Sequence, residues 1–481
     1  MAIPVNYYKW FQSVIDFFIA LFFICSLVSN LFVYISVFSG WIKYLLFVVI
    51  AAVFVLAVFF LKKPLRKLIE RLLTLLSECS FRKLLVLLLF SSAVLKVISY
   101  AFFFFDSTKA GGDITIYASL AEGIVENGLS SIADQIYYLA GMGLHLSLFR
   151  YLSIPYHLGI YLVFLLATAV NFYSFSKRIG KEKSFLLIEL YLLMPSTSLL
   201  TFCITHELFV YLYFSLILLL LNAFLEKQDR RSCLLYAALL FAAVSLNQTV
   251  SPIGKIWYIV LFLIVLLADL HWSKKGMLVI VLAASLFCTN LLSTGLEGNT
   301  PSQSNNIEQL LIGSNLESMG RHTDGRGKQA AKAYWEARGV KLTYENLVEG
   351  EKGALIETYK YLLTHPLKLM ELLANKFYVA WSGDFYSVEY GHVMGSIGDM
   401  MYYVMLLLGS LIWLLTVSIG IVYYKKRDDS IGIYNYKLIL LGIMGVLLIT
   451  EIMNKYSCYM TVFIFFIAFS RTDLCEGDRN G

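Results

Sequence analysis

The chain has 481 residues, of which 59% are hydrophobic and only 15% are charged, and its mean hydropathy is +0.71. A soluble chain carries about a quarter of charged residues, so this composition excludes a soluble globular enzyme. The net charge of +6 comes largely from short basic segments, which indicate membrane topology rather than a nucleic-acid partner. The seven cysteines form no CxxC or Cys/His cluster, so neither a disulfide framework nor a zinc site is expected.

Apolar runs of about 20 residues recur along the chain, and each could cross the roughly 30 Å hydrocarbon core of a bilayer. We predict an all-α polytopic membrane protein with about 12 transmembrane helices, outer-face interfacial helices and one large extracytoplasmic loop. The predicted spans, in chain order, cover about 13–37, 42–61, 84–105, 155–175, 184–203, 208–225, 232–248, 254–271, 276–293, 399–422, 436–453 and 457–470.

Basic segments set the predicted topology. The positive-inside rule places Lys/Arg-rich loops in the cytoplasm, and four such loops agree with one orientation: 177–183, 226–231, 271–275 and 425–429. Both termini are then cytoplasmic, and the protein is expected in the cell membrane. Residues 137–151 are apolar but short, and making them a span would move 177–183 outside. We therefore predict an interfacial helix there.

Four regions follow from this topology. Residues 1–83 form a two-span extension that ends in a basic amphipathic cytoplasmic helix, 61–83. Residues 84–293 form a transmembrane core that includes a first outer loop, 106–154. Residues 294–397 form an extracytoplasmic region with helices near 326–339, 350–364 and 367–381. Residues 398–481 supply the last spans and a short cytoplasmic tail.

The first outer loop holds the strongest functional candidate. Gly111 and Gly112 directly precede Asp113, which lets the backbone turn tightly and leaves the carboxylate uncrowded. Apolar residues then recur at helical spacing, which predicts a short amphipathic helix along the membrane surface. A carboxylate placed there can act as a general base toward a hydroxyl group. An acidic loop without a chemical role is the alternative interpretation.

Other polar residues are predicted at the same outer face. Those expected to bind substrate are Asp106, Tyr117, His206, Glu207, Asn247, Gln248, Asn315 and Arg321. Those expected near a donor phosphate are Lys255, Glu451 and Lys455. Cations would stabilise the charge of a departing phosphate. The chain has no GxxxxGKS phosphate loop, so the energy for a reaction outside the cytoplasm would arrive in a lipid-linked donor.

The order of these features resembles the GT-C superfamily of membrane glycosyltransferases, in the branch of protein O-mannosyltransferases and aminoarabinose-lipid A transferases. The resemblance covers roughly 84–470 and rests on five weak motifs in order. These are an aspartate with a tyrosine four residues on (Asp113, Tyr117, Ala121, Gly128), an interfacial helix followed by a span and a basic loop (137–151 and 177–183), a Pro-Ser span that ends in an acidic residue (Pro195, Ser196, Glu207), a GxN…G stretch in the large outer loop (Gly313, Asn315, Gly320), and an acidic residue before a basic-Tyr pair near the C-terminus (Glu451, Lys455, Tyr456). The chain departs from the family in having three spans before the aspartate loop.

The resemblance implies an inverting glycosyltransferase that moves a sugar from a polyprenyl-phosphate donor to a glycan, lipid or protein acceptor. Asp113 would be the catalytic base, and Lys455 and Tyr456 would lie near the donor phosphate. Some relatives use a divalent cation such as Mg²⁺ or Mn²⁺, and the sequence leaves this open here.

Two other functions stay open. A lipid-linked oligosaccharide polymerase or ligase would favour a large outer loop with arginines, such as Arg321, Arg326 and Arg338. A transporter or flippase without chemistry would favour broken spans with charges near the bilayer midplane. Few charges fall inside the predicted spans, and the main ones are Asp16, Lys96 and Glu189.

Overall fold

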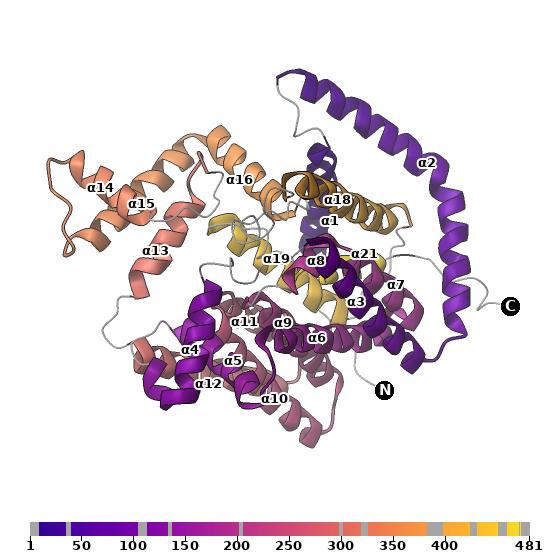
Figure 1. Ribbon diagram of the computed structural model, residues 1–481, viewed down its shortest axis with the longest axis horizontal. Helices are drawn as coiled ribbons and strands as arrows, with labels where there is room; N and C mark the ends of the chain where they lie inside the picture. The colour runs from indigo at the N-terminus through magenta and orange to yellow at the C-terminus, as the bar shows by residue number, and fades with distance from the viewer. Residues whose placement is uncertain are drawn as a thin grey trace.

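The computed structural model describes a helical protein, and the described residues contain no sheet (Figure 1). It describes residues 9–34, 40–103, 113–132, 137–201, 205–297, 302–318, 326–381, 398–423, 431–450, 459–470 and 472. The prediction of an all-α protein is confirmed for these parts of the chain.

Several helices are long and apolar enough to cross a membrane. Within the described ranges there are seven: α1 (Lys9–Val33), α2 (Ile42–Ser77), α6 (Tyr156–Ile179), α9 (Glu207–Glu226), α10 (Arg230–Val250), and the stretches Trp272–Leu291 of α12 (Trp272–Glu297) and Gly432–Ile449 of α19 (Ile431–Ile449). Shorter apolar helices are α11 (Ile256–Leu267), the 407–422 part of α18 (Gly398–Val422), and α21 (Thr461–Ser470). The chain therefore has the helices of a multi-pass membrane protein, whereas the finer expectation of 12 spans stays a prediction.

Two predicted segments differ from the helices that form. The stretch 184–203 is divided into α7 (Lys181–Leu192) and α8 (Pro195–Leu200), because Pro195 lacks the N–H that would continue the helix. The predicted span 42–61 and most of the basic segment after it form one helix, α2, with Pro64 inside it. Figure 1 shows α2 as a long, bent helix along one side of the molecule.

The elements before α6 agree with the sequence pattern. They are α3 (Phe81–Phe103), α4 (Asp113–Asn127), the 3₁₀ turn η2 (Gly128–Ile132) and α5 (Tyr137–Tyr151). The helices expected after Asp113 and over 137–151 are thus confirmed as helices. A glycine at position 180 with φ of 87° then separates α6 from α7, a conformation that side chains with a Cβ rarely adopt.

Helix α9 lies at the centre of the bundle, since its own side chains are buried on nearly every face. Polar side chains fix the helices around it. The Asn171 amide of α6 donates to Ser215 of α9 at 2.8 Å. The Asn435 amide of α19 donates to Asn222 of α9 at 2.6 Å. Asn435 is near the start of α19 and Asn222 near the end of α9, so these two helix ends lie side by side.

The bundle has two chemically different ends. At one end, which we call the basic end, Arg178 of α6 pairs with Glu226 of α9, and Lys274 of α12 donates to the Leu225 carbonyl at 2.8 Å. The start of α19 also lies there, because a Cβ on Gly432 would meet the Arg178 guanidinium. The opposite end, which we call the far end, holds the start of α9, the end of α10 and the start of α11. The end of α19 lies there too, because a Cβ on Gly442 would meet Ile256 at the start of α11. Segments from separate parts of the sequence therefore end at the far end.

Helix α1 is packed into this bundle. The Phe22 ring lies edge-on to Trp381 with centroids 5.1 Å apart, and the Trp413 indole N–H donates to Ser26. Near the basic end, the Lys437 ammonium of α19 lies 2.9 Å from the Asp16 carboxylate. By contrast, the apolar half of α2 faces outward, with the Phe59 side chain 75% exposed. An outward apolar surface of this kind suits contact with lipid.

Replacing Asp16 with Asn tests this ion pair. The change leaves the fully buried Lys437 ammonium without its carboxylate, and removing one partner of a buried pair costs about 3–5 kcal/mol. We expect a loss of about 3 kcal/mol in unfolding free energy, the low end of that range, because the Asp16 side chain is 34% exposed. The matched control is Glu371→Gln in the exposed Lys368–Glu371 pair, with an expected loss below about 1 kcal/mol. Equal losses in the two variants would contradict the packing of α1 described above.

Four helices in the second half of the chain form a separate group, which we call the loop unit (Figure 1). They are α13 (Ser302–Gly313), α14 (Arg326–Glu336), α15 (Leu347–Thr364) and α16 (Pro366–Trp381). The helices expected near 326–339, 350–364 and 367–381 are thereby confirmed. Glycines let α14 and α15 approach closely, since a Cβ on Gly353 would lie 2.2 Å from the Tyr334 ring. Figure 1 shows the loop unit and α2 on opposite sides of the bundle.

Candidate functional site

The clearest meeting of predicted site residues is a contact between α4 and the start of α9. The Tyr117 hydroxyl lies 3.2 Å from Nδ1 of His206, and the Tyr117 side chain is only 1% exposed. Asp113 is the first residue of α4 and comes four residues before Tyr117, so the two positions share one face of the helix. The side chain of Asp113 lies outside what the structure describes.

The same place holds a buried carboxylate. Glu207 is the first residue of α9 and is fully buried, and its Oε1 lies 3.7 Å from Nε2 of His206. A carboxylate is favoured at a helix N-terminus because the first N–H groups carry a partial positive charge there. Tyr117, His206 and Glu207 thus form a polar group at the far end of the bundle, which we call the far-end triplet.

Helix α5 packs against α4 and, through the half-buried His145, against α9. The Gly141 carbonyl lies 2.7 Å from Nδ1 of His145, so Nδ1 carries the proton and donates. Nε2 is then an acceptor for the Tyr213 hydroxyl of α9, 2.6 Å away. Both nitrogens are used by the neutral ring, and burial lowers the pKa of His145 below its usual range.

This histidine predicts a dependence of stability on pH. The folded pKa of His145 is below the unfolded value of about 6.5. Between these values only the unfolded chain binds the proton, so the free energy of unfolding falls as the pH drops below about 6.5. Thermal unfolding in detergent from pH 7.5 to 5.5 should show this slope reduced in His145→Gln. The slope should be unchanged in the control His365→Gln, because the His365 side chain is exposed. Equal slopes in all three proteins would contradict the neutral, half-buried His145.

The end of α10 brings two more predicted residues to the far end. Asn247 and Gln248 are both fully buried, and the Asn247 amide lies against Gly254 in the turn η3 (Pro252–Lys255). Within the part of the chain that the structure describes, neither side-chain amide has a hydrogen-bond partner. Lys255 closes the same turn and is exposed. The turn therefore presents two amides and a cation at this end of the bundle.

The loop unit reaches the bundle at the end of α13. Asn315 is largely buried, and its side-chain oxygen accepts from the Glu317 N–H at 3.1 Å, which makes a local turn. Gly313 lies against the end of α19, since a Cβ there would be 2.4 Å from the Thr450 carbonyl oxygen. The chain after Thr450 carries three predicted donor-site residues, Glu451, Lys455 and Tyr456, which lie outside the described residues. Asp106 and Arg321 also lie outside them.

Lys376, which the sequence pattern did not single out, connects these parts. Its ammonium donates to the carbonyls of Gly313 at 3.0 Å, Leu448 at 2.7 Å and Thr450 at 2.5 Å. The side chain is fully buried in α16, and burial lowers the pKa of Lys376 to about 7. One sequence signal could have indicated that Lys376 is buried. It comes four residues after Leu372 and four before Ala380, which places it on the apolar face of α16.

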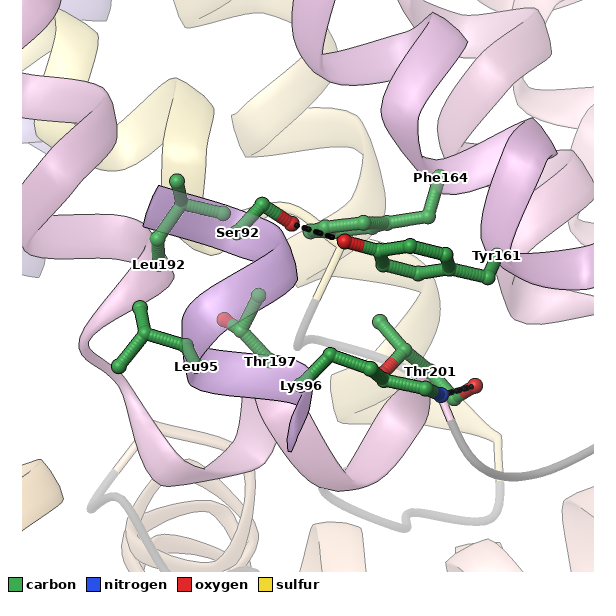
Figure 2. Close-up of a pocket in the computed structure, with 8 residues that line it drawn as sticks. All are labelled: Ser92, Leu95, Lys96, Tyr161, Phe164, Leu192, Thr197 and Thr201. Carbon is green, nitrogen blue, oxygen red and sulfur yellow. Dashed lines mark hydrogen bonds between the residues drawn. The ribbon is translucent and has the colours of Figure 1, made fainter. Parts of the chain in front are cut away.

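The main charged residues inside the predicted spans, Asp16, Lys96 and Glu189, each have a hydrogen-bond or ion-pair partner within the protein. Besides the Asp16–Lys437 pair, Glu189 accepts from the Ser91 hydroxyl at 2.7 Å and Lys96 donates to Thr201. Figure 2 shows Lys96 reaching Thr201 across a small cavity, beside the Ser92–Tyr161 hydrogen bond. That cavity is about 10 Å³, room for about one water molecule and too small for a sugar.

Among the residues that the structure describes, no group of three or more His, Cys, Asp or Glu side chains could hold a metal ion. Dependence on Mg²⁺ or Mn²⁺, which the sequence leaves open, is therefore no part of the mechanism below.

Comparison with protein-family models, with curated proteins and with solved structures found no match to this chain. The far-end residues must therefore be interpreted from their own chemistry.

Proposed function

We propose that the chain is an integral-membrane glycosyltransferase of the GT-C type. It would move a sugar from a polyprenyl-phosphate donor to a glycan, lipid or protein acceptor outside the cytoplasm, with inversion at the sugar carbon. The observation that most supports this is the contact of Tyr117 with His206. It joins the start of α4, where Asp113 is placed, to the start of α9, two segments that the resemblance named separately.

The two ends of the bundle support the same proposal. Arg178, Lys274 and the loop after α9 lie at the basic end, which the positive-inside rule places in the cytoplasm. The far-end triplet then faces the outside, where a lipid-linked donor is the available source of an activated sugar. This orientation in the membrane is part of the proposal.

In the proposed reaction Asp113 is the general base. It takes the proton of the acceptor hydroxyl as the hydroxyl oxygen attacks the anomeric carbon, and the bond from that carbon to the donor phosphate breaks. The departing polyprenyl phosphate carries the negative charge, which Lys255 or Lys455 would neutralise. The buried amides of Asn247 and Gln248 suit the hydroxyl groups of a sugar, because buried amides need hydrogen-bond partners.

The alternative of a polymerase or ligase draws on arginines in the loop unit. Arg338 donates to the Tyr334 carbonyl at 2.8 Å and pairs with Glu357, so its guanidinium is used within the loop unit. The alternative of a transporter draws on charges inside spans. Asp16, Lys96 and Glu189 each have a partner in the protein, which favours a structural role for them. Both observations favour the single-sugar transferase.

The proposal is tested with purified protein in liposomes and a panel of radiolabelled polyprenyl-phosphate sugars. Membrane glycans, lipids and a protein extract serve as acceptors. We expect label to move from one donor to one acceptor class, with release of polyprenyl phosphate. Movement of a lipid-linked oligosaccharide across the bilayer without any transfer would support the transporter and contradict the proposal.

A further inference from the structure

The buried ammonium of Lys376 lies where three chain segments meet. Its three acceptors are backbone carbonyls at the ends of two helices, Gly313 of α13 and Leu448 and Thr450 at the end of α19. The last carbonyls of a helix have no partner within that helix, and they carry its partial negative charge. One ammonium has three N–H donors, so Lys376 satisfies one carbonyl with each of them.

The surrounding packing leaves little room for another arrangement. Gly313 is in direct backbone contact with α19, since a Cβ there would lie 2.4 Å from the Thr450 carbonyl oxygen and 2.5 Å from that of Ile449. Helix α16 is also held at its own C-terminus, where the Asn30 amide of α1 donates to the Trp381 carbonyl at 2.8 Å. Helix α16 is thus joined to α13, α19 and α1 at neighbouring places.

We propose that Lys376 is the positioning residue that docks the loop unit onto the end of α19. Asn315 follows Gly313 by two residues, and the segment with Glu451, Lys455 and Tyr456 begins directly after Thr450. Docking at Lys376 therefore sets where these two segments start relative to one another. The consequence for the reaction rests on the proposed function, whereas the docking itself does not.

The test compares two substitutions of Lys376 with one control in the full-length protein. Lys376→Met keeps an unbranched side chain, one heavy atom shorter, and removes its three donors, while Lys376→Arg keeps the charge and hydrogen-bond donors. The control is Lys368→Met on the same helix, an exposed lysine paired with Glu371. The readout is amide hydrogen exchange of peptides that cover 307–318 and 443–450.

We expect exchange in both peptides to be at least tenfold faster in Lys376→Met, with Lys376→Arg closer to wild type and Lys368→Met unchanged. Rescue by Arg and not by Met would show that the donors matter, rather than the volume of the side chain. Exchange in Lys376→Met equal to wild type would overturn the proposal. Equal acceleration in the Met and Arg variants would also overturn it, because packing alone would then explain the effect.

The same variants address the reaction once a donor is known. We expect Lys376→Met to lower kcat/KM for the donor by about tenfold or more, because a misplacement of about 1 Å can cost up to about 10²-fold. An unchanged kcat/KM, measured per folded protein, would overturn the link to the reaction. If wild-type protein transfers no sugar from any donor, the proposed function fails while the exchange result still decides the docking.

Discussion

Asp113→Asn is expected to reduce sugar transfer by roughly 10²–10⁴-fold in kcat, the usual contribution of a general base. The amide keeps the size of the side chain and cannot accept the proton of the acceptor hydroxyl. Asn has nearly the same size as Asp at this first position of α4, so the fold should be retained. The measurement is steady-state transfer from the donor that wild-type protein uses, with unfolding temperature recorded for each variant.

Two controls make this result specific. Glu126→Gln removes an exposed carboxylate near the other end of α4 and should leave transfer unchanged. Asp106→Asn tests the nearest competing carboxylate in the sequence and should retain most of the activity. Full activity in Asp113→Asn, with loss in Asp106→Asn, would keep the enzyme class and move the base to Asp106.

Gly141→Ala is expected to destabilise the protein by roughly 3 kcal/mol or more, because the new methyl group has no space. An ideal Cβ on Gly141 would lie 1.8 Å from the carbonyl oxygen of Thr249, which is backbone and cannot rotate away. The clash would push α5 away from the end of α10, where Asn247 and Gln248 lie. Transfer should therefore fall together with the unfolding temperature.

Gly445→Ala is the matched control for this clash. Gly445 is also inside a helix, α19, and a Cβ there has nothing within 4 Å. Alanine in a helix interior is favoured over glycine by about 0.5–1 kcal/mol, so this variant should be as stable as wild type or slightly more stable. If both variants have the same unfolding temperature, the close approach of α5 to α10 is wrong.

Local patterns predicted the helices well because each depends on a short stretch of sequence. The helix at 137–151 was expected from its apolar composition, and α5 has those bounds. The three helices of the long polar region were likewise expected from their spacing. The break of the span 184–203 could also have been expected, since Pro195 removes an N–H inside it.

The candidate site was predictable as a set of residues but not as a set of contacts. Tyr117 and His206 were both selected, yet they are 89 residues apart, and periodicity says nothing about which helices meet. Lys376 was missed because a lysine in an amphipathic helix is usually a solvated residue. Only the convergence of two helix ends, at Gly313 and Thr450, gives its charge a reason to be buried.

The measurement that tests the central claim most directly is the anomeric configuration of the first transfer product, determined by NMR beside that of the donor. A single displacement assisted by a base at Asp113 inverts the sugar carbon, so the account predicts opposite configurations in donor and product. The same configuration in both would contradict it, because retention requires a second displacement and a nucleophile that the proposed mechanism does not contain.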